Sequence, residues 1–455
     1  MSAMKTIFKK RILLLAGLLL AACKVGPDYQ LPSIDLPESW MGNKEYKDAK
    51  AESAEWWKNF NDPVLNELIE KAKTQNLSLK EAKARVAEAR ALAQGADAEL
   101  FPQVNVGGGV TKSDGGKKLF QAGFDALWEA DIFGGNRRIA EAAGADHEAA
   151  EADHDDVMLS LEAEVVRNYV ELRLYQRQLE LAKQTLETQG NTVRITDARY
   201  KEGVEGRLEV VRAGAQLNST KAQVPLYESA VGASSYRLEF LLGEKPGSLK
   251  EKLVAGKDIP LSDPIKATST PLEVIARRPD VKAAERRLAS ATALQGAAIA
   301  DMYPKLSISA VLGLESGSAG KLFRSSSKVW SVGGNLLMPL FDFGRVRSNI
   351  DASDARQEQA MAQYESAVLA ALGDVETAML AYAKESERRE NLQEAADDSK
   401  KAVEISQLQY KEGIISQLDV LQAQQTMYNA QTALAESTAA VSYNLIALNK
   451  ALALY

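Results

Sequence analysis

The chain has 455 residues, with 55 Lys and Arg against 62 Asp and Glu, and a formal net charge of −7. The first 22 residues hold four bases and no acid, so the remainder carries 51 bases against 62 acids, a balance of −11. This excess of acid argues against a nucleic-acid partner, because no basic surplus exists to neutralise phosphates. A single Cys excludes a disulfide framework and a zinc site built from several thiolates.

Little in the sequence supports catalysis. His147 and His154 are the two histidines, and seven residues of helix separate them, too far to share a zinc ion easily. No G-x-x-x-x-G-K-[ST] loop is present, which excludes P-loop nucleotide hydrolysis. We therefore predict that the chain is not an enzyme and that it holds neither a metal ion nor a cofactor.

Residues 1–22 have the pattern of a secretory signal peptide. A basic region between Lys5 and Arg11 precedes an apolar run of nine residues, too short to span a bilayer as a helix. The small residues before Cys23 look like a bacterial lipobox, which predicts that Cys23 carries the lipid and begins the mature chain. The alternative is an ordinary cleavage site with an incidental Cys. Residues 23–61 are then a lipid-anchored extended tail, and no later apolar run reaches the ~18 residues of a transmembrane helix.

The chain contains two copies of one unit, because its motifs recur at a fixed distance. The sequence Tyr-Lys-Glu-Gly at 200–203 returns at 410–413, an offset of 210. We predict repeat 1 at 62–243 and repeat 2 at 271–455, joined by a linker at 244–270.

Each copy contains a predicted β-hairpin, at 102–132 and at 304–342. Apolar residues there occupy even positions, whereas odd positions include Asp125 and Asn335. Period two predicts two-faced strands, whose length suits a membrane crossing of ~9–11 residues, although a half-buried sheet in a soluble domain would show the same alternation. The apolar even positions are Val104, Val106, Phe120, Ala122, Phe124, Ala126, Trp128, Ala130, Ile132, Leu306, Ile308, Ala310, Leu312, Leu314, Trp330, Val332, Leu336, Met338 and Leu340.

Each hairpin leads into a predicted pair of long helices, at 136–243 and 344–453. The first run is nearly free of Pro and spaces Val165, Leu172, Leu179 and Leu186 by seven, which is typical of coiled-coil packing. Each pair turns near a glycine, a residue that accepts the positive φ of a tight turn.

Four strands per chain cannot close a barrel, since lipid tolerates no open sheet edge and single-chain barrels begin at ~8 strands. Several chains must therefore share one barrel, and the spacing leaves open whether two, three or four do so. A non-conducting coiled-coil lipoprotein is the competing interpretation, but such a spacer needs no membrane-crossing sheet.

The sequence resembles the TolC family of outer-membrane efflux channels, in its lipoprotein branch. The matching motifs are Trp56 to Pro63 (WWKNFNDP), Arg277 to Val281 (RRPDV), Asp131 to Gly134 (DIFG), Pro339 to Gly344 (PLFDFG) and the two turns. The resemblance implies a mixed fold, with a membrane β-barrel and an all-α coiled-coil barrel. It implies a homotrimer with twelve strands and a twelve-helix periplasmic tunnel, with the linker in an equatorial region.

The resemblance also implies a function. The channel would sit in the outer membrane of a Gram-negative cell, lipid-anchored and extending into the periplasm. It would be a passive exit duct for drugs or other small molecules, opened by a periplasmic adaptor protein and an inner-membrane transporter, of the RND type. Type I protein secretion is the alternative within the same family.

In the family the tunnel narrows at the helical turns. The matching positions predict gate residues and adaptor-contact tips, although ordinary coiled-coil packing would also place such residues there. Gln422 and Arg212 stand where a carboxylate ring would be expected, so Asp419 is the substitute. The predicted gate is Tyr410, Leu418, Asp419, Arg199 and Tyr200, and the predicted tips are Gly203, Val204, Gly413 and Ile414.

Overall fold

The computed structural model describes residues 24–41, 55–253, 258–262 and 270–454. The predicted signal peptide at 1–22 and the predicted lipidation site Cys23 lie outside the described residues. The chain divides into two compact units, and each unit takes segments from both sequence copies. The first unit is Met1–Ile34, Ala82–Asp153 and Asp280–Ala367, and the second is Asp35–Glu81, His154–Pro279 and Val368–Tyr455.

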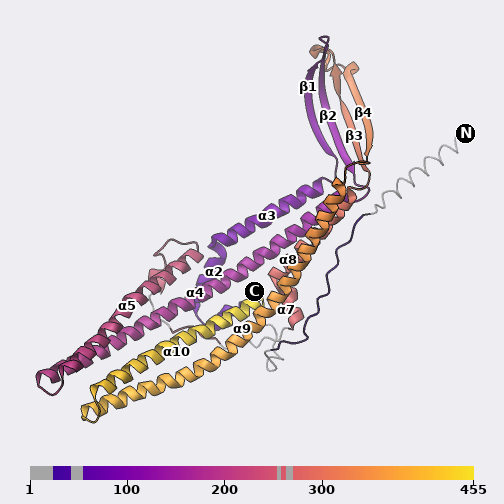
Figure 1. Ribbon diagram of the computed structural model, residues 1–455. Coiled ribbons are helices and arrows are strands. Elements are labelled where there is room, and N and C mark those ends of the chain that lie inside the picture. Colours follow the sequence, from indigo (N-terminus) through magenta and orange to yellow (C-terminus); the bar gives the residue numbers. More distant parts are fainter. Residues whose placement is uncertain (1–23, 42–54, 254–257, 263–269, 455) are drawn as a thin grey trace. The chain divides into compact units, whose positions relative to one another are not determined.

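The elements follow the order helix, strand, strand, long helix, long helix twice (Figure 1). The second long pair has the bounds of the first pair moved by 210 residues, which confirms the predicted duplication of the helical hairpins. In chain order they are η1 (Trp56–Phe60), α2 (Pro63–Gln75), α3 (Leu77–Ala98), β1 (Gln103–Lys112), β2 (Lys118–Ala130), α4 (Gly135–Lys201), α5 (Arg207–Leu241), α6 (Lys250–Leu253), α7 (Pro271–Arg277), α8 (Pro279–Ala300), β3 (Lys305–Ser316), η2 (Ala319–Lys321), η3 (Ser325–Ser327), β4 (Lys328–Leu337), α9 (Arg345–Lys411) and α10 (Gln417–Ala451).

The four strands form one antiparallel sheet in the order β1-β2-β3-β4 (Figure 1). Its register aligns the even positions, so that Val106, Phe124, Leu312 and Trp330 make one cross-strand row in which all four side chains are exposed. On the opposite face Asn105 donates to Asp125 at 3.2 Å. The predicted two-faced strands are therefore confirmed, and β1 and β4 each have an outer edge with no neighbouring strand among the described residues.

Three segments differ from the sequence prediction. Strand β2 ends at Ala130, so Ile132 falls outside it. Strand β4 ends at Leu337, so Met338 and Leu340 fall outside it, because Pro339 has no N–H to donate to a strand ladder. The predicted extended tail is also wrong at its end, since Trp56–Phe60 forms a 3-10 helix. Both of its tryptophans are buried in the apolar core of the second unit, and this burial favours a compact turn over an extended chain.

The core of the second unit collects apolar residues from η1, α2, α4, α5, α9 and α10. A polar chain crosses it, in which Asp62 accepts from the Val64 amide at 2.9 Å and from the Tyr169 hydroxyl at 2.7 Å. Arg173 donates to the same hydroxyl at 2.8 Å. Asp62 thereby caps α2 and ties it to the middle of α4, because its two oxygens serve different elements.

Helix α9 is, within the described part of the chain, the one helix that is long and apolar enough by composition to cross a membrane. Its most apolar window has a mean hydropathy of 1.2 and is 33% buried. Val375, Met379 and Tyr382 of this helix belong to the apolar core of the second unit. Packing against that core accounts for this part of the apolar composition of α9, whereas Leu369 and Leu380 of the same helix are 67% and 61% exposed.

Candidate functional site

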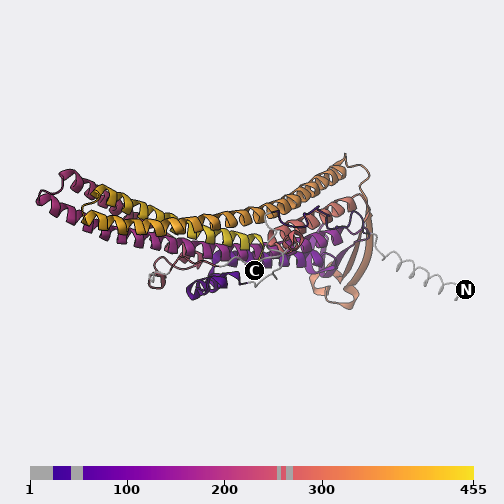
Figure 2. The ribbon, with the colours of Figure 1, turned by 90° about the horizontal axis from the view of Figure 1, so that it is seen from below.

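The two helical turns lie at the same end of the second unit (Figure 1), and the view from below agrees (Figure 2). Gly203 has φ 77° and Gly413 has φ 75°, a left-handed conformation that glycine adopts without strain. The residue after each glycine is apolar and exposed, with Val204 at 67% and Ile414 at 69%. The predicted tip residues thus present two matching apolar side chains at the surface of the described chain.

Arg199, Glu205 and Tyr410 form a contact between the two turns, which we call the turn bracket. The Tyr410 hydroxyl donates to Glu205 Oε1 at 3.1 Å. The Arg199 guanidinium lies 4.5 Å from the centre of the Tyr410 ring and 3.7 Å from Glu205 Oε1. Burial is the main cause that raises the pKa of Tyr410, so its hydroxyl stays protonated and able to donate at neutral pH. The bracket joins residues about 200 positions apart and holds the first hairpin to the second.

Asp419 accepts hydrogen bonds from the start of its own helix. Ser416 is the N-cap of α10, and its amide and hydroxyl donate to Asp419 Oδ2 at 2.9 and 2.7 Å. These hydrogen bonds lower the pKa of the Asp419 carboxyl, because they stabilise its ionised form. Leu418 beside it is 45% exposed and Tyr200 is 41% exposed. Of the predicted gate residues, the structure brings Arg199 and Tyr410 together and leaves Leu418, Asp419 and Tyr200 outside the bracket.

Polar side chains occupy the interface between α4 and α10 next to the two turns. Gln417 donates to the Thr196 hydroxyl, and Gln424 donates to the Thr192 hydroxyl at 3.2 Å. Gln417, Gln424 and Thr196 are all buried. Separation of α10 from α4 at this level would return polar groups to water, and hydration of those groups offsets the lost contacts. An apolar cluster containing Leu181 and Tyr428 begins further along the same helices.

Glu205 is the member of the bracket that the sequence analysis did not select. The sequence did contain a signal for this position, because the residue that corresponds to Glu205 in the second copy, 210 residues later, is Ile415. A charged residue in one copy and an apolar residue in the other marks a position at which the two turns differ in role. The Ser416–Asp419 capping box was also readable from its spacing.

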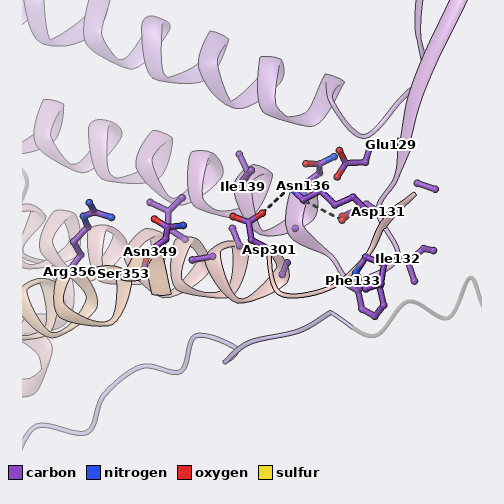
Figure 3. A pocket seen from close by; sticks show the side chains of 18 residues that line it. Glu129, Asp131, Ile132, Phe133, Asn136, Ile139, Asp301, Asn349, Ser353 and Arg356 are labelled. Atoms are coloured by element: carbon purple, nitrogen blue, oxygen red, sulfur yellow. Dashed lines mark hydrogen bonds and ion pairs between the residues drawn. The ribbon is translucent and has the colours of Figure 1, made fainter. Parts of the chain in front are cut away.

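A pocket of about 270 Å³ lies in the first unit where strands meet helices (Figure 3). Asp131 on its wall accepts from the amides of Asn136 and Arg137 at 3.2 and 2.9 Å, and so caps the start of α4. Asp301 on the same wall pairs with Lys305 at 2.9 Å. Both carboxylates are paired with groups of the protein itself. Because Asp131 binds the first amides of α4, the pocket wall fixes the direction in which this helix leaves the sheet.

The segment that follows Cys23 is clamped in the first unit by a fully buried arginine. Arg138 donates to the carbonyls of Val25 and Gly26 at 3.1 and 3.0 Å and pairs with Asp28 at 3.0 Å. Gly26 has φ 82°, and a Cβ there would lie 2.5 Å from the Cα of Gly296. The backbone at Gly26 therefore approaches α8 more closely than any other residue type permits.

The histidines lie apart from these sites. His147 accepts from Arg90 at 3.2 Å, and His154 lies 3.3 Å from Asp155. A group of three His, Cys, Asp or Glu side chains suited to a metal ion is not found among the residues that the structure describes.

Comparison with known proteins identifies the family to which this arrangement of sheet and helical hairpins belongs. The family model described as outer membrane efflux protein matches residues 68–244 and 270–454. Nodulation protein T of Rhizobium leguminosarum bv. trifolii is 30% identical over 430 residues, which cover 92% of each chain. The pyoverdine export outer membrane protein OpmQ of Pseudomonas aeruginosa is 30% identical over 98% of this chain and 96% of its own. The solved outer-membrane channel OprN has a TM-score of 0.89 at 33% identity, over 95% of this chain and 99% of that one.

The chain belongs to the outer membrane efflux protein family. It has the fold of the TolC-like outer-membrane channels, in which a small sheet and long helical hairpins share one chain. Its location is the outer membrane and its function is that of the outer-membrane channel of a tripartite efflux system. Members of this family are channels and not enzymes.

Proposed function

We propose that three copies of this chain close one twelve-stranded barrel and one twelve-helix periplasmic tunnel, and that drugs or other small molecules leave the cell passively through it. The observation that carries this proposal is the sheet of four strands with an apolar face and two open edges, at β1 and β4. The bilayer core holds no water that could bind an exposed backbone N–H or C=O group, so each such group must pair within the protein. The two open edges must therefore pair with the edges of further copies. The resemblance to the TolC family supplies the number three.

Cross-linking between the two edges tests the trimer. Ser331→Cys of β4 is combined in turn with a cysteine at each odd position of β1, from Gln103 to Thr111, because the stagger of a closed barrel shifts the register between neighbouring copies. One of these pairs on the polar face should give a covalent trimer after oxidation in membranes, whereas either single cysteine should not. The single-cysteine chains are the matched controls. Covalent dimers that never extend to trimers would contradict the proposal, and a purified assembly that conducts no ions in planar bilayers would contradict the duct itself.

The tunnel is closed at the helical turns in its resting state. The turn bracket of Arg199, Glu205 and Tyr410 holds the second hairpin against the first, and Leu418 and Asp419 line the constriction. The exposed Leu418 resists wetting, and a ring of Asp419 carboxylates would favour cations over anions. The buried polar layer of Gln417 and Gln424 lowers the cost of separating the hairpins, so a docked partner can shift the population toward the open state.

The constriction is tested by comparing the two copies. A Leu418→Ala/Asp419→Ala protein should show higher resting conductance and admit large antibiotics, with normal trimer assembly. The matched control is Leu208→Ala/Glu209→Ala, at the equivalent positions of the first copy, which should do less. A leak in the control together with parental conductance in the Leu418→Ala/Asp419→Ala protein would show that the constriction lies on the other hairpin.

The tips receive the periplasmic adaptor protein, which couples the channel to an inner-membrane transporter of the RND type. Val204 and Ile414 support this role, because both are apolar and exposed at matching turns. Val204→Asp/Ile414→Asp should abolish adaptor cross-linking and efflux while conductance in bilayers persists. Lys201→Asp, at an exposed site in the same turn region, is the charge-bearing control and should retain most of the cross-linking. Undiminished cross-linking in the first variant would contradict the docking site.

The mature chain is held in the membrane through lipid on Cys23. The lipobox and the basic region before it support this anchor. The clamp at Arg138 then fixes the next residues, Val25 to Asp28, against the junction of sheet and helices. The apolar surface that the barrel buries in lipid is much larger than that of the acyl anchor, so the anchor supplements the barrel and does not replace it.

A further inference from the structure

Lysines occupy the ends of the strands that lie farthest from the helices. Lys112 ends β1 and Lys118 begins β2, and the two are Cα partners in the sheet. Lys328 begins β4 and is the partner of Leu314. All three side chains are exposed and occupy even positions. They therefore share a face with the apolar row of Val106, Phe124, Leu312 and Trp330 and continue that face outward.

Acidic side chains of the same strands lie on the opposite face. Glu315 accepts from Gln121 at 3.4 Å, and Asp125 accepts from Asn105 at 3.2 Å. All four of these residues are at odd positions. At the end of the sheet farthest from the helices, the charge is thus sorted by face, with Lys112, Lys118 and Lys328 on the apolar side and Glu315 on the polar side. Lys305, at the opposite end of β3, occupies an odd position and pairs with Asp301.

The three lysines carry their charge without a protein counterion, since none of them takes part in an ion pair in the described chain. Lys112 and Lys118 are direct partners, whereas Lys328 lies in the row of Leu314 and Ala122, four residues along β2 from Lys118 and two strands away. Like charges directly opposite each other across a strand pair destabilise the pair, and Lys112 and Lys118 are placed in that way. The adjacent loops add Lys117, Lys321 and Arg324 against one acid, Asp114, so the loops also carry a net positive charge. An arrangement of this kind is stabilised by an external anion.

Trp330 places these lysines relative to a membrane. Tryptophan is enriched at the boundary between hydrocarbon and headgroups, and Trp330 is 77% exposed on the apolar face. Lys328 lies two residues further out, a distance of about 7 Å along a strand. A lysine can lay its methylene stem along apolar surface and place its ammonium among headgroups.

We propose that Lys112, Lys118 and Lys328 form an outer lysine girdle that binds the phosphate groups of an outer-leaflet lipid of the lipopolysaccharide class. The inference rests on the proposed barrel, whose strands cross the outer membrane with their turns outward. Lysine binds phosphate as a point charge, and the trimer repeats the girdle around the barrel three times. The girdle fixes the barrel in the outer leaflet by attaching it to the anionic lipid that surrounds it.

Binding of purified lipopolysaccharide to the full-length trimer in detergent tests the girdle. We would measure the apparent Kd by fluorescence with labelled lipid for the parent and for Lys112→Gln/Lys118→Gln/Lys328→Gln. The matched control is Lys83→Gln/Lys221→Gln/Lys400→Gln, which removes the same charge from exposed sites on α3, α5 and α9. The girdle variant should bind at least tenfold more weakly, and the control should bind like the parent.

Two further ligands identify the chemistry. Enzymatically dephosphorylated lipid should bind the parent as weakly as intact lipid binds the girdle variant, and rising salt should weaken parental binding. Inorganic phosphate should compete poorly, because it lacks the acyl chains that seat the lipid on the apolar face.

Other outcomes would overturn the girdle. Equal binding by the parent and the girdle variant would do so, as would full competition by millimolar inorganic phosphate. A girdle variant with altered ion selectivity and unchanged lipid binding would instead place the lysines in the lumen. Conductance in planar bilayers is measured on every variant, so a channel that conducts without binding lipid separates failure of the girdle from failure of the proposed barrel.

Discussion

Removal of one hydroxyl from the turn bracket should open the channel. Tyr410→Phe deletes the hydrogen bond to Glu205, which is 3.1 Å long, and keeps the aromatic ring that lies 4.5 Å from the Arg199 guanidinium. The substitution therefore removes the polar contacts of the hydroxyl, with Glu205 and with Arg199, and leaves the cation–π contact in place. Tyr200→Phe removes a hydroxyl from a 41% exposed ring outside the bracket and is the matched control.

The size of the effect follows from the geometry. A hydrogen bond to a charged group contributes about 1.5–3 kcal/mol, and partial exposure of this bond reduces the expected loss to about 1 kcal/mol per chain. If three chains open together, the closed state loses about 3 kcal/mol, which raises the ratio of open to closed channels roughly 100-fold. Arg199→Gln removes the cation–π contact and the weak pairing with Glu205, each worth about 0.5–1 kcal/mol at an exposed site, and should act in the same direction.

Single-channel recording in planar bilayers measures this ratio directly. Tyr410→Phe should spend a much larger fraction of time in the conducting state than the parent, with the same unitary conductance and the same trimer mass. Tyr200→Phe should match the parent. The reasoning would be refuted if Tyr410→Phe gated like the parent, or if Tyr200→Phe opened the channel as strongly, since neither result is compatible with a closed state held by the bracket.

Three further predictions concern other parts of the chain. Val332→Arg, on the apolar face two residues inward of Trp330, should lower the free energy of unfolding in lipid vesicles by about 2–4 kcal/mol, whereas Ser331→Arg on the polar face should change it by less than about 1 kcal/mol, and equal losses would invert the assigned faces. Mass spectrometry of the mature protein should find a lipidated Cys23 at its N-terminus, and an unmodified Cys23 or another start would disprove the anchor. The Asp419 carboxyl stabilises the start of α10 while it is ionised. Because its folded pKa lies below the ordinary value of about 3.9, this contribution is complete above that value and is lost as pH falls through the folded pKa. Amide protection at the start of α10 should therefore drop in the parent as the pH is lowered below the ordinary range of an Asp carboxyl, but not in Asp419→Asn, in which protection is already low, and a similar drop in both would contradict the cap.

Local patterns in the sequence were sufficient to place most elements. Period two marked the strands at 102–132 and 304–342, and spacing by seven with few prolines marked the helices, because each pattern depends on residues close together along one element. The offset of 210 between the copies is reproduced by the bounds of α4 and α9. Leu337 ends β4 for an equally local reason, the proline that follows, which the sequence analysis did not apply.

The tertiary structure decided which side chains meet. Arg199 and Glu205 flank one turn and Tyr410 precedes another, and no periodicity relates them, so their contact depends on how the two hairpins pack. Sequence motifs nominated Arg199 and Tyr410 without linking them. Arg138 is a similar case, since only the folded chain brings residues Val25 and Gly26 to a buried guanidinium more than 100 positions away. Local sequence determines the elements because hydrophobic spacing acts within one element, whereas long-range polar contacts are determined only when packing closes the distance between elements.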